Sequence, residues 1–110
     1  MDNCIFCKIS SHQVSSEVVA ENDEAIVFKD IHPKAEIHWL VVPKAHISSV
    51  SQVGTEDWPV VTSILKMAAE TAKNKGLAGY KLVFNVGRDG GQMVDHIHLH
   101  ILSGNKIELP

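Results

Sequence analysis

The chain has 110 residues, of which 45% are hydrophobic, so it is long enough to bury a core in one domain without disulfide bonds. Its formal net charge is −3 and its 10 lysine and arginine residues are scattered, which argues against an extended nucleic-acid-binding surface. The first residues do not resemble a secretory signal, and apolar runs such as residues 39–42 are too short to span a bilayer. We therefore expect a soluble, cytoplasmic protein with neither nucleic acid nor membrane as its partner.

Three short segments in the first half of the chain are typical of strands. Residues 14–21 are rich in valine, residues 25–28 follow a cluster of turn-forming residues, and residues 37–42 end at Pro43. Residues 46–50 are expected to form a single helical turn.

Residues 56–75 form the one long helix that the sequence predicts. Thr55 is the expected N-cap, and the acidic residues that follow it favour the positive end of the helix dipole. Apolar residues recur at helical spacing and give one packing face, made of Val60, Ile64, Met67, Ala68 and Ala72. Gly76 is expected to end the helix.

A strand, a glycine-rich turn and a second strand are expected after this helix. Residues 81–86 alternate, with Leu82, Phe84 and Val86 on one face, and residues 87–92 form the turn. Because strands dominate and most connections are short, the sequence predicts an α+β fold in which a helix packs on one face of an antiparallel sheet.

Three histidines alternate with aliphatic residues near the end of the chain, at positions 96, 98 and 100. Successive side chains of a strand point to opposite faces, so the histidines share one face at intervals of about 6.6–6.8 Å. The aliphatic residues Ile97, Leu99 and Ile101 share the other face and are expected in the core. Imidazole binds metals and can act as a nucleophile or a proton carrier. The pattern predicts a row of reactive side chains, although a histidine-rich polar face would look the same.

Four segments, in order along the chain, resemble those of the histidine triad family. The run from His96 to Leu102 is similar to the triad signature, and the other three segments are residues 30–33, 42–47 and 85–92. The resemblance extends from Ile5 to about Gly104 and is closest to the histidine triad nucleotide-binding branch. It implies a homodimer and a single domain over residues 1–110. The implied HIT-like fold has an antiparallel sheet of about five strands, one long helix and short N-terminal helical turns.

The resemblance also implies a purine nucleoside phosphoramidate hydrolase that works in two steps, with AMP-type nucleotides as ligands and without a catalytic cofactor. His98 would attack the α-phosphorus, expel an amine and form a nucleotidyl-histidine that water then cleaves. His100 would donate a hydrogen bond to a phosphate oxygen. His38 matches a fourth histidine that assists proton movement, although an ordinary strand histidine is an equal alternative. The nucleophilic nitrogen must be unprotonated, so its partner nitrogen needs an acceptor, for which a backbone carbonyl would serve.

Matching positions imply the nucleotide-binding residues as well. Asp30 would bind the ribose hydroxyls, and the base would lie among Ile5, Phe6, Phe28 and Ile31. The phosphate would lie near Asn85, Gly91, Gln92, Met93, His98 and His100. The glycine pair at residues 90–91 suits close approach of the backbone to an anion, although a plain hairpin turn needs it equally.

Two positions depart from the family. Met93 stands where close relatives commonly carry a serine near the phosphate, so one hydrogen bond to the leaving group is missing. The C-terminal residues 105–110 lack the tryptophan that many animal members carry, and this end influences the choice of substrate in the family.

Cys4 and Cys7 form a Cys-x-x-Cys pair, which alone is half of a zinc site. Some bacterial relatives complete the site with the histidines that correspond here to His46 and His96. Two thiolates and two imidazoles would give a closed tetrahedral zinc site with a structural role. The alternatives are two buried thiols without a metal, or a redox pair.

Three other functions remain open from the sequence. The first is a dinucleoside polyphosphate hydrolase of the same superfamily. The second is a metal-dependent enzyme in which all three histidines of the triad hold one ion. The third is a nucleotide-binding adaptor with little turnover.

Overall fold

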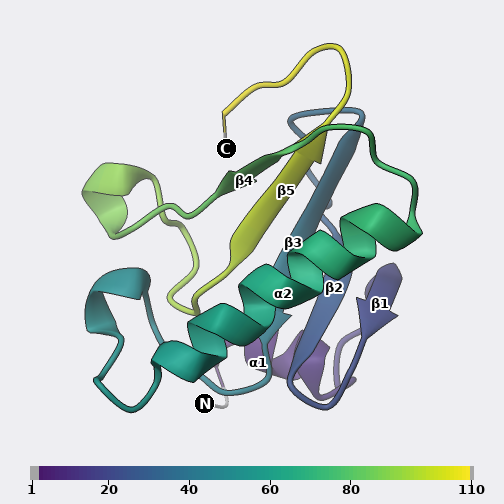
Figure 1. The fold of residues 1–110 in the computed structure, drawn as a ribbon. Coiled ribbons are helices and arrows are strands. Elements are labelled where there is room, and N and C mark those ends of the chain that lie inside the picture. Colours follow the sequence, from purple (N-terminus) through teal and green to yellow (C-terminus); the bar gives the residue numbers. More distant parts are fainter. Residues whose placement is uncertain (1–2, 110) are drawn as a thin grey trace.

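The computed structural model describes residues 3–109 and contains one five-stranded antiparallel sheet, with the strand order β1-β2-β3-β5-β4 (Figure 1). The strands are β1 (Val18–Glu21), β2 (Ala25–Lys29), β3 (Ile37–Pro43), β4 (Lys81–Val83) and β5 (Leu99–Ser103). The last strand of the chain inserts between β3 and β4, so the histidine-bearing β5 is an interior strand. The predicted α+β fold with an antiparallel sheet is confirmed.

The two α-helices pack on opposite faces of the sheet. The long helix α2 (Trp58–Asn74) crosses the face that is nearer the viewer in Figure 1, and the short helix α1 (Ile5–Ser10) lies behind the sheet. Two 3₁₀ turns, Val50–Gln52 and Arg88–Gly90, lie in the connections. None of the helices within residues 3–109 is long and apolar enough to cross a lipid bilayer.

Strand alternation divides the interior into two cores. On β2, Ala25 and Val27 pack with α2, whereas Ile26 and Phe28 pack with α1. Since adjacent strands are in register, the same division continues across β3 and β5. The sheet is therefore covered on both faces. His38, His98 and His100 lie on the face that α1 covers.

The long helix is close to its predicted range, but its predicted N-cap is wrong. The helix begins at Trp58 with Asp57 as its N-cap, and no side chain makes a capping hydrogen bond. A turn closed by the Asp57 N–H and the Gly54 carbonyl, 2.9 Å apart, precedes the helix and contains Thr55. Gly76 follows the helix with a φ of 74°, as expected for a glycine that ends a helix.

Two other local predictions are also wrong. Residues 46–49 form no helical turn, because the Ile47 carbonyl accepts a hydrogen bond from the Ile97 N–H at 2.6 Å and the segment runs beside the histidines. The strand predicted over residues 81–86 ends at Val83. In the register of β4 with β5, residues 85 and 86 would lie beyond Leu99, where β5 begins, so they have no partner on that strand.

Candidate active site

The alternation predicted for the histidine run is confirmed, although residues 96–98 precede the strand. Ile97, Leu99 and Ile101 belong to the core beneath α2. The rings of His98 and His100 lie on the α1 face with their centroids 4.9 Å apart, and the Phe6 ring packs edge-on against His98 at 5.0 Å. A rigid aliphatic face therefore holds the imidazoles in place on the other side of the chain.

His98 is buried, and its tautomer follows from one hydrogen bond. Its Nδ1 lies 2.8 Å from the main-chain carbonyl oxygen of His96. A carbonyl can only accept, so Nδ1 carries the proton and Nε2 of the neutral ring keeps its lone pair. Burial lowers the pKa of His98, which favours this neutral form. The ring therefore presents an unprotonated nitrogen, as a nucleophile requires.

A second chain of hydrogen bonds fixes the protons of His38 and His100. The Lys34 N–H donates to His38 Nδ1 at 3.0 Å, so the proton of neutral His38 is on Nε2. That nitrogen lies 2.9 Å from His100 Nδ1 and 3.4 Å from a carboxylate oxygen of Asp30. When His38 donates to His100 Nδ1, the proton of His100 is on Nε2.

Nε2 of His100 has no hydrogen-bond partner among the described residues, although it is buried. A buried donor without an acceptor is costly, and ligand sites are one of the places where it occurs. Burial, and the neighbouring charges of His98 and His38, lower the pKa of His100 to about 4, so the ring is neutral at pH 7. The arrangement leaves one N–H available to an acceptor that enters from the adjacent cavity.

That cavity has a volume of about 770 Å³ and lies on the α1 face, with His38, His98 and His100 in its wall. This volume is typical of small-molecule sites. Of the residues predicted to contact a nucleotide, all but one line this cavity. Those that line it are Ile5, Phe6, Phe28, Asp30, Ile31, Asn85, Gly91, Met93, His98 and His100. Ile31 and Met93 are 88% and 80% exposed, so they belong to its rim.

The exception is Gln92, and the structure does not support its predicted contact with a phosphate. Its side chain is buried and holds the loop together instead. The amide nitrogen donates to the carbonyl oxygens of Ser48 and Val94 at 2.7 and 2.9 Å, and the amide oxygen accepts from the Gly87 N–H at 2.9 Å. Both amide hydrogens are used within the protein, so no donor is left for a ligand.

Sequence reasoning missed several residues of the cavity wall. Ile9, Leu40 and Val94 add apolar surface, and residues 14–17 together with Lys29, His32 and Lys34 complete the wall. Alternation along β3 could have identified Leu40, which lies on the same face as His38. No sequence signal marks Lys34, because its main-chain N–H makes the decisive contact with His38.

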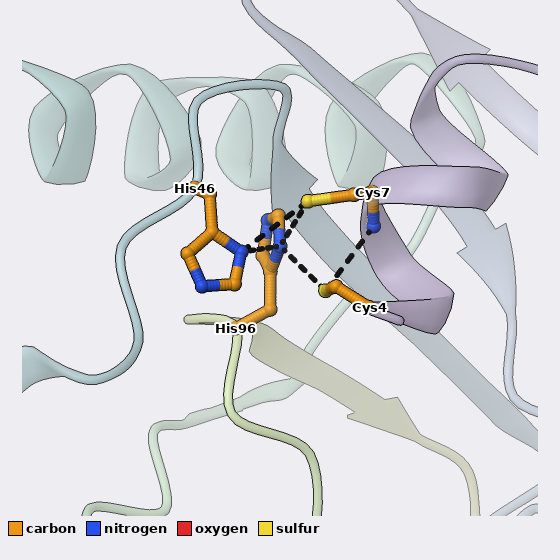
Figure 2. A group of neighbouring side chains, drawn as sticks. All are labelled: Cys4, Cys7, His46 and His96. Carbon is orange, nitrogen blue, oxygen red and sulfur yellow. Dashed lines mark hydrogen bonds between the residues drawn. The ribbon is translucent and has the colours of Figure 1, made fainter. Parts of the chain in front are cut away.

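The four residues of the predicted zinc site come together, as Figure 2 shows, and could hold a metal ion. Cys4 is the N-cap of α1 and Cys7 lies in that helix, whereas His46 comes from the segment after β3 and His96 from the start of the histidine run. His96 Nδ1 lies 3.3 Å from Cys4 Sγ, 3.4 Å from Cys7 Sγ and 3.1 Å from His46 Nδ1. Cys7 Sγ lies 3.3 Å from His46 Nδ1.

These distances and the surrounding hydrogen bonds fit a metal. A tetrahedral zinc ion with ordinary bond lengths requires about 3.3 Å between two nitrogens and about 3.6 Å between nitrogen and sulfur. His96 Nε2 donates to the Pro43 carbonyl at 2.8 Å, so its Nδ1 lone pair points into the cluster. Burial and the adjacent Cys4 raise the pKa of the Cys7 thiol to about 11. A bound cation is the usual means of turning such a thiol into a thiolate ligand.

A second group, Asp30, His38 and His100, also lies within reach of one ion. Its hydrogen bonds argue against a metal, because Lys34 donates to His38 Nδ1 and leaves the proton on the very nitrogen that would ligate. The triad does not converge on one ion either, since His96 belongs to one group, His100 to the other and His98 to neither. The interpretation of the triad as a three-histidine metal site is therefore wrong.

Comparisons with known proteins agree with this fold. Residues 3–108 match the protein family described as "Scavenger mRNA decapping enzyme C-term binding". "Protein HitA" of Neisseria gonorrhoeae is 42% identical over 103 residues, which cover 93% of this chain and 96% of that protein. A HIT family hydrolase from Legionella pneumophila has 43% identity and a TM-score of 0.91, with 98% of each chain covered. A histidine triad protein from Clostridium difficile has 40% identity and a TM-score of 0.92, with 100% of this chain and 96% of the other covered.

Proposed function

The chain belongs to the histidine triad superfamily, and on that basis we propose that it hydrolyses purine nucleoside phosphoramidates and releases a nucleoside monophosphate. The observation that carries the proposal is the state of His98. Its Nδ1 is committed to the His96 carbonyl, and its unprotonated Nε2 belongs to a ring in the wall of a cavity of nucleotide size. The HIT family hydrolases among the similar structures support hydrolysis in general.

The proposed reaction has two displacements at phosphorus. In the first, the lone pair of His98 Nε2 forms a bond to the α-phosphorus, the P–N bond of the substrate breaks, and the amine leaves with a proton supplied by the solvent. In the second, a water molecule attacks the nucleotidyl-imidazole and loses a proton to the solvent, the bond between phosphorus and His98 breaks, and its electron pair returns to Nε2 of the neutral ring. Both steps suit imidazole, which is a good nucleophile at neutral pH and a good leaving group from phosphorus.

His100 and His38 support this reaction through their protons. The unpaired N–H of His100 would donate to a non-bridging phosphate oxygen, where negative charge accumulates in each transition state. His38 would keep that proton on Nε2 of His100, because it donates to the opposite nitrogen. In this role His38 is a positioning residue.

The base, ribose and phosphate of the proposed nucleotide would occupy different parts of the cavity. Phe6 and Phe28 pack edge to face at 5.6 Å and would contact the base together with Ile5 and Ile31. Asp30 would accept hydrogen bonds from the ribose hydroxyls. One of its oxygens accepts from the His32 N–H at 2.8 Å and the other lies 3.4 Å from His38 Nε2, and a carboxylate oxygen with one such partner keeps a lone pair. Asn85, Gly91 and Met93 would surround the phosphate and the leaving group.

We also propose that the cluster of Cys4, Cys7, His46 and His96 binds zinc in a structural role. A zinc ion bound there would supply no chemistry to the reaction, because a Cys₂His₂ set leaves no open coordination position. Its direct effect would be to join α1 to the start of the histidine run.

A homodimer is the proposed assembly. The strand β4 is at one edge of the sheet, and Leu82 on this strand is 40% exposed. Tyr80 and Val86, on either side of β4, and Leu65, in α2, also expose apolar surface. Edge strands and exposed apolar side chains are common at sites of association. Sedimentation of wild type and Leu82→Glu tests the assembly: the variant should shift toward the mass of a monomer.

Initial rates on two substrates, together with the affinity for AMP, test the proposed function. We expect an adenosine phosphoramidate to yield AMP much faster than diadenosine tetraphosphate does. The opposite preference would identify a dinucleoside polyphosphate hydrolase. Tight binding of AMP with no turnover of either substrate would identify an adaptor.

A further inference from the structure

We propose that the Cys4–Cys7–His46–His96 cluster, when it holds a metal, positions His98 for catalysis and so acts on the reaction although it lies outside it. The role of His98 as the nucleophile rests on the proposed function. The effect of the cluster on the position of His98 rests instead on two physical connections between the cluster and the His98 ring. One connection runs through the main chain of His96, and the other runs through α1.

The first connection is a single residue that serves both groups. The His96 ring contributes Nδ1 to the cluster and donates from Nε2 to the Pro43 carbonyl, so a metal would fix the ring at both nitrogens. The carbonyl oxygen of the same residue accepts from His98 Nδ1 at 2.8 Å. This carbonyl sets both the tautomer and the direction of the His98 ring.

Ile97, which lies between His96 and His98, is also held by a hydrogen bond to a segment that carries a residue of the cluster. The Ile97 N–H donates to the Ile47 carbonyl at 2.6 Å, and Ile47 directly follows the ligand His46. Because residues 96–98 lie outside the β5 ladder, these bonds replace the strand pairing that would otherwise hold them. A metal that bridges His46 and His96 would clamp the two segments that carry the Ile97–Ile47 bond.

The second connection is the short helix α1. Cys4 is its N-cap and its sulfur accepts from the Cys7 N–H at 3.4 Å, and Phe6 lies between the two cysteines in sequence. The Phe6 ring packs edge-on against the His98 ring, with centroids 5.0 Å apart and an interplanar angle of 79°. A helix of 6 residues is not stable alone, so its attachment to the rest of the protein decides where Phe6 lies.

The inference is tested on the 110-residue protein as purified, after removal of the metal with a chelator, and after zinc is added back. Nitrogen-15 NMR of the histidine rings reports the tautomer and the mobility of His98, whose signals are assigned by comparison with His98→Gln. Zinc per chain is measured by elemental analysis, and turnover and AMP affinity are measured in parallel. Cys4→Ser and Cys7→Ser remove ligands, and His12→Gln, an exposed histidine outside both sites, is the matched control.

Removal of the metal should broaden the His98 ring signals or mix its two tautomers, and zinc should restore a single Nδ1–H form. Turnover should fall about 10-fold or more, as is common when a group that orients an active side chain is lost. The affinity for AMP should fall by a smaller factor. Phe6→Leu should keep its zinc and still perturb the His98 signals, which separates the helix connection from the main-chain connection. His12→Gln should match wild type in every measurement.

Two results would overturn the inference. One is a folded wild-type protein that binds no zinc. The other is a metal-free protein with the same His98 spectrum and turnover as the zinc-loaded form. If His98 responds to zinc but no phosphoramidate is hydrolysed, the proposed function fails while the coupling stands.

Discussion

His38 Nε2 lies 2.9 Å from His100 Nδ1, and this buried contact joins the paired strands β3 and β5 on the face that carries the cavity. Each nitrogen has a defined state, because the Lys34 N–H leaves the His38 proton on Nε2. The two rings therefore form an ordered path that ends at the unpaired N–H of His100. The predictions below follow from this path, from His98 and from the loop beside them.

Replacement of His38 with leucine, which cannot donate a hydrogen bond, should reduce turnover about 10- to 100-fold with a smaller change in KM, a loss at or below the lower end of acid–base contributions. The reason is that His100 loses the partner that keeps its proton on Nε2. Steady-state kinetics on an adenosine phosphoramidate measure the effect. Full activity would show that His38 is an ordinary buried strand residue.

Replacement of His98 with alanine should reduce turnover by a factor of about 10³ or more, as loss of a nucleophile does in other enzymes. AMP affinity should change by less than about tenfold, or 1.4 kcal/mol, because most of the cavity wall is unchanged. Calorimetric titration and kinetics on the same preparation provide both values. Equal losses in turnover and affinity would mean that His98 only maintains the structure.

The pH dependence of stability should depend on His100. Its pKa is lowered from 6.5 to about 4 by burial, so between these values the unfolded chain binds a proton that the folded chain does not. The free energy of unfolding should therefore be highest above about pH 6.5 and fall as the pH drops toward 4, with His100 accounting for about 3 kcal/mol of that fall.

Denaturant unfolding of wild type and His100→Gln at pH 7, 5.5 and 4.5 measures this contribution. Acid also weakens a Cys₂His₂ metal site, but it does so in both proteins, so the difference between them isolates His100. The wild type should lose more stability than the variant over this range. Parallel pH profiles would contradict the assignment of a depressed pKa to this ring.

Gln92→Glu should destabilise the protein by about 2–3 kcal/mol, because a carboxylate cannot donate to the carbonyls of Ser48 and Val94. Gln52→Ala, at an exposed position nearby, is the control and should cost little. Thermal unfolding compares the two variants. A stable Gln92→Glu protein with weakened AMP binding would restore the predicted role of Gln92 at the phosphate.

Much of this arrangement could be predicted because it depends on periodicity. The alternation of histidine and aliphatic residues places the two sets on opposite faces even at residues 96–98, before the ladder of β5 begins. Helical spacing gives most of the buried face of α2 in the same way, with Ile64, Met67 and Ala68 buried as expected. The four residues of the candidate metal site are predicted only through a family resemblance, since nothing in a lone Cys-x-x-Cys indicates which distant histidines complete it.

The wrong predictions concern features that tertiary contacts decide. Thr55 looks like an N-cap, yet the turn that begins at Gly54 moves the helix start to Trp58. Gln92 has a polar side chain beside the cavity, and only the position of Ser48, far away in sequence, shows that its amide is already bonded. Main-chain partners such as the His96 carbonyl and the Lys34 N–H cannot be predicted from residue types, because almost every residue carries the same main-chain groups.

The most direct test of the account is the search for a covalent adduct on His98. Wild type is mixed with an adenosine phosphoramidate, quenched within the first turnover and analysed by intact-mass and peptide mass spectrometry under conditions that preserve phosphorus–nitrogen bonds. We predict one adenylyl group per chain on the peptide that contains His98, and none in His98→Ala. Rapid hydrolysis by His98→Ala, or an adduct on any other residue, would contradict the account.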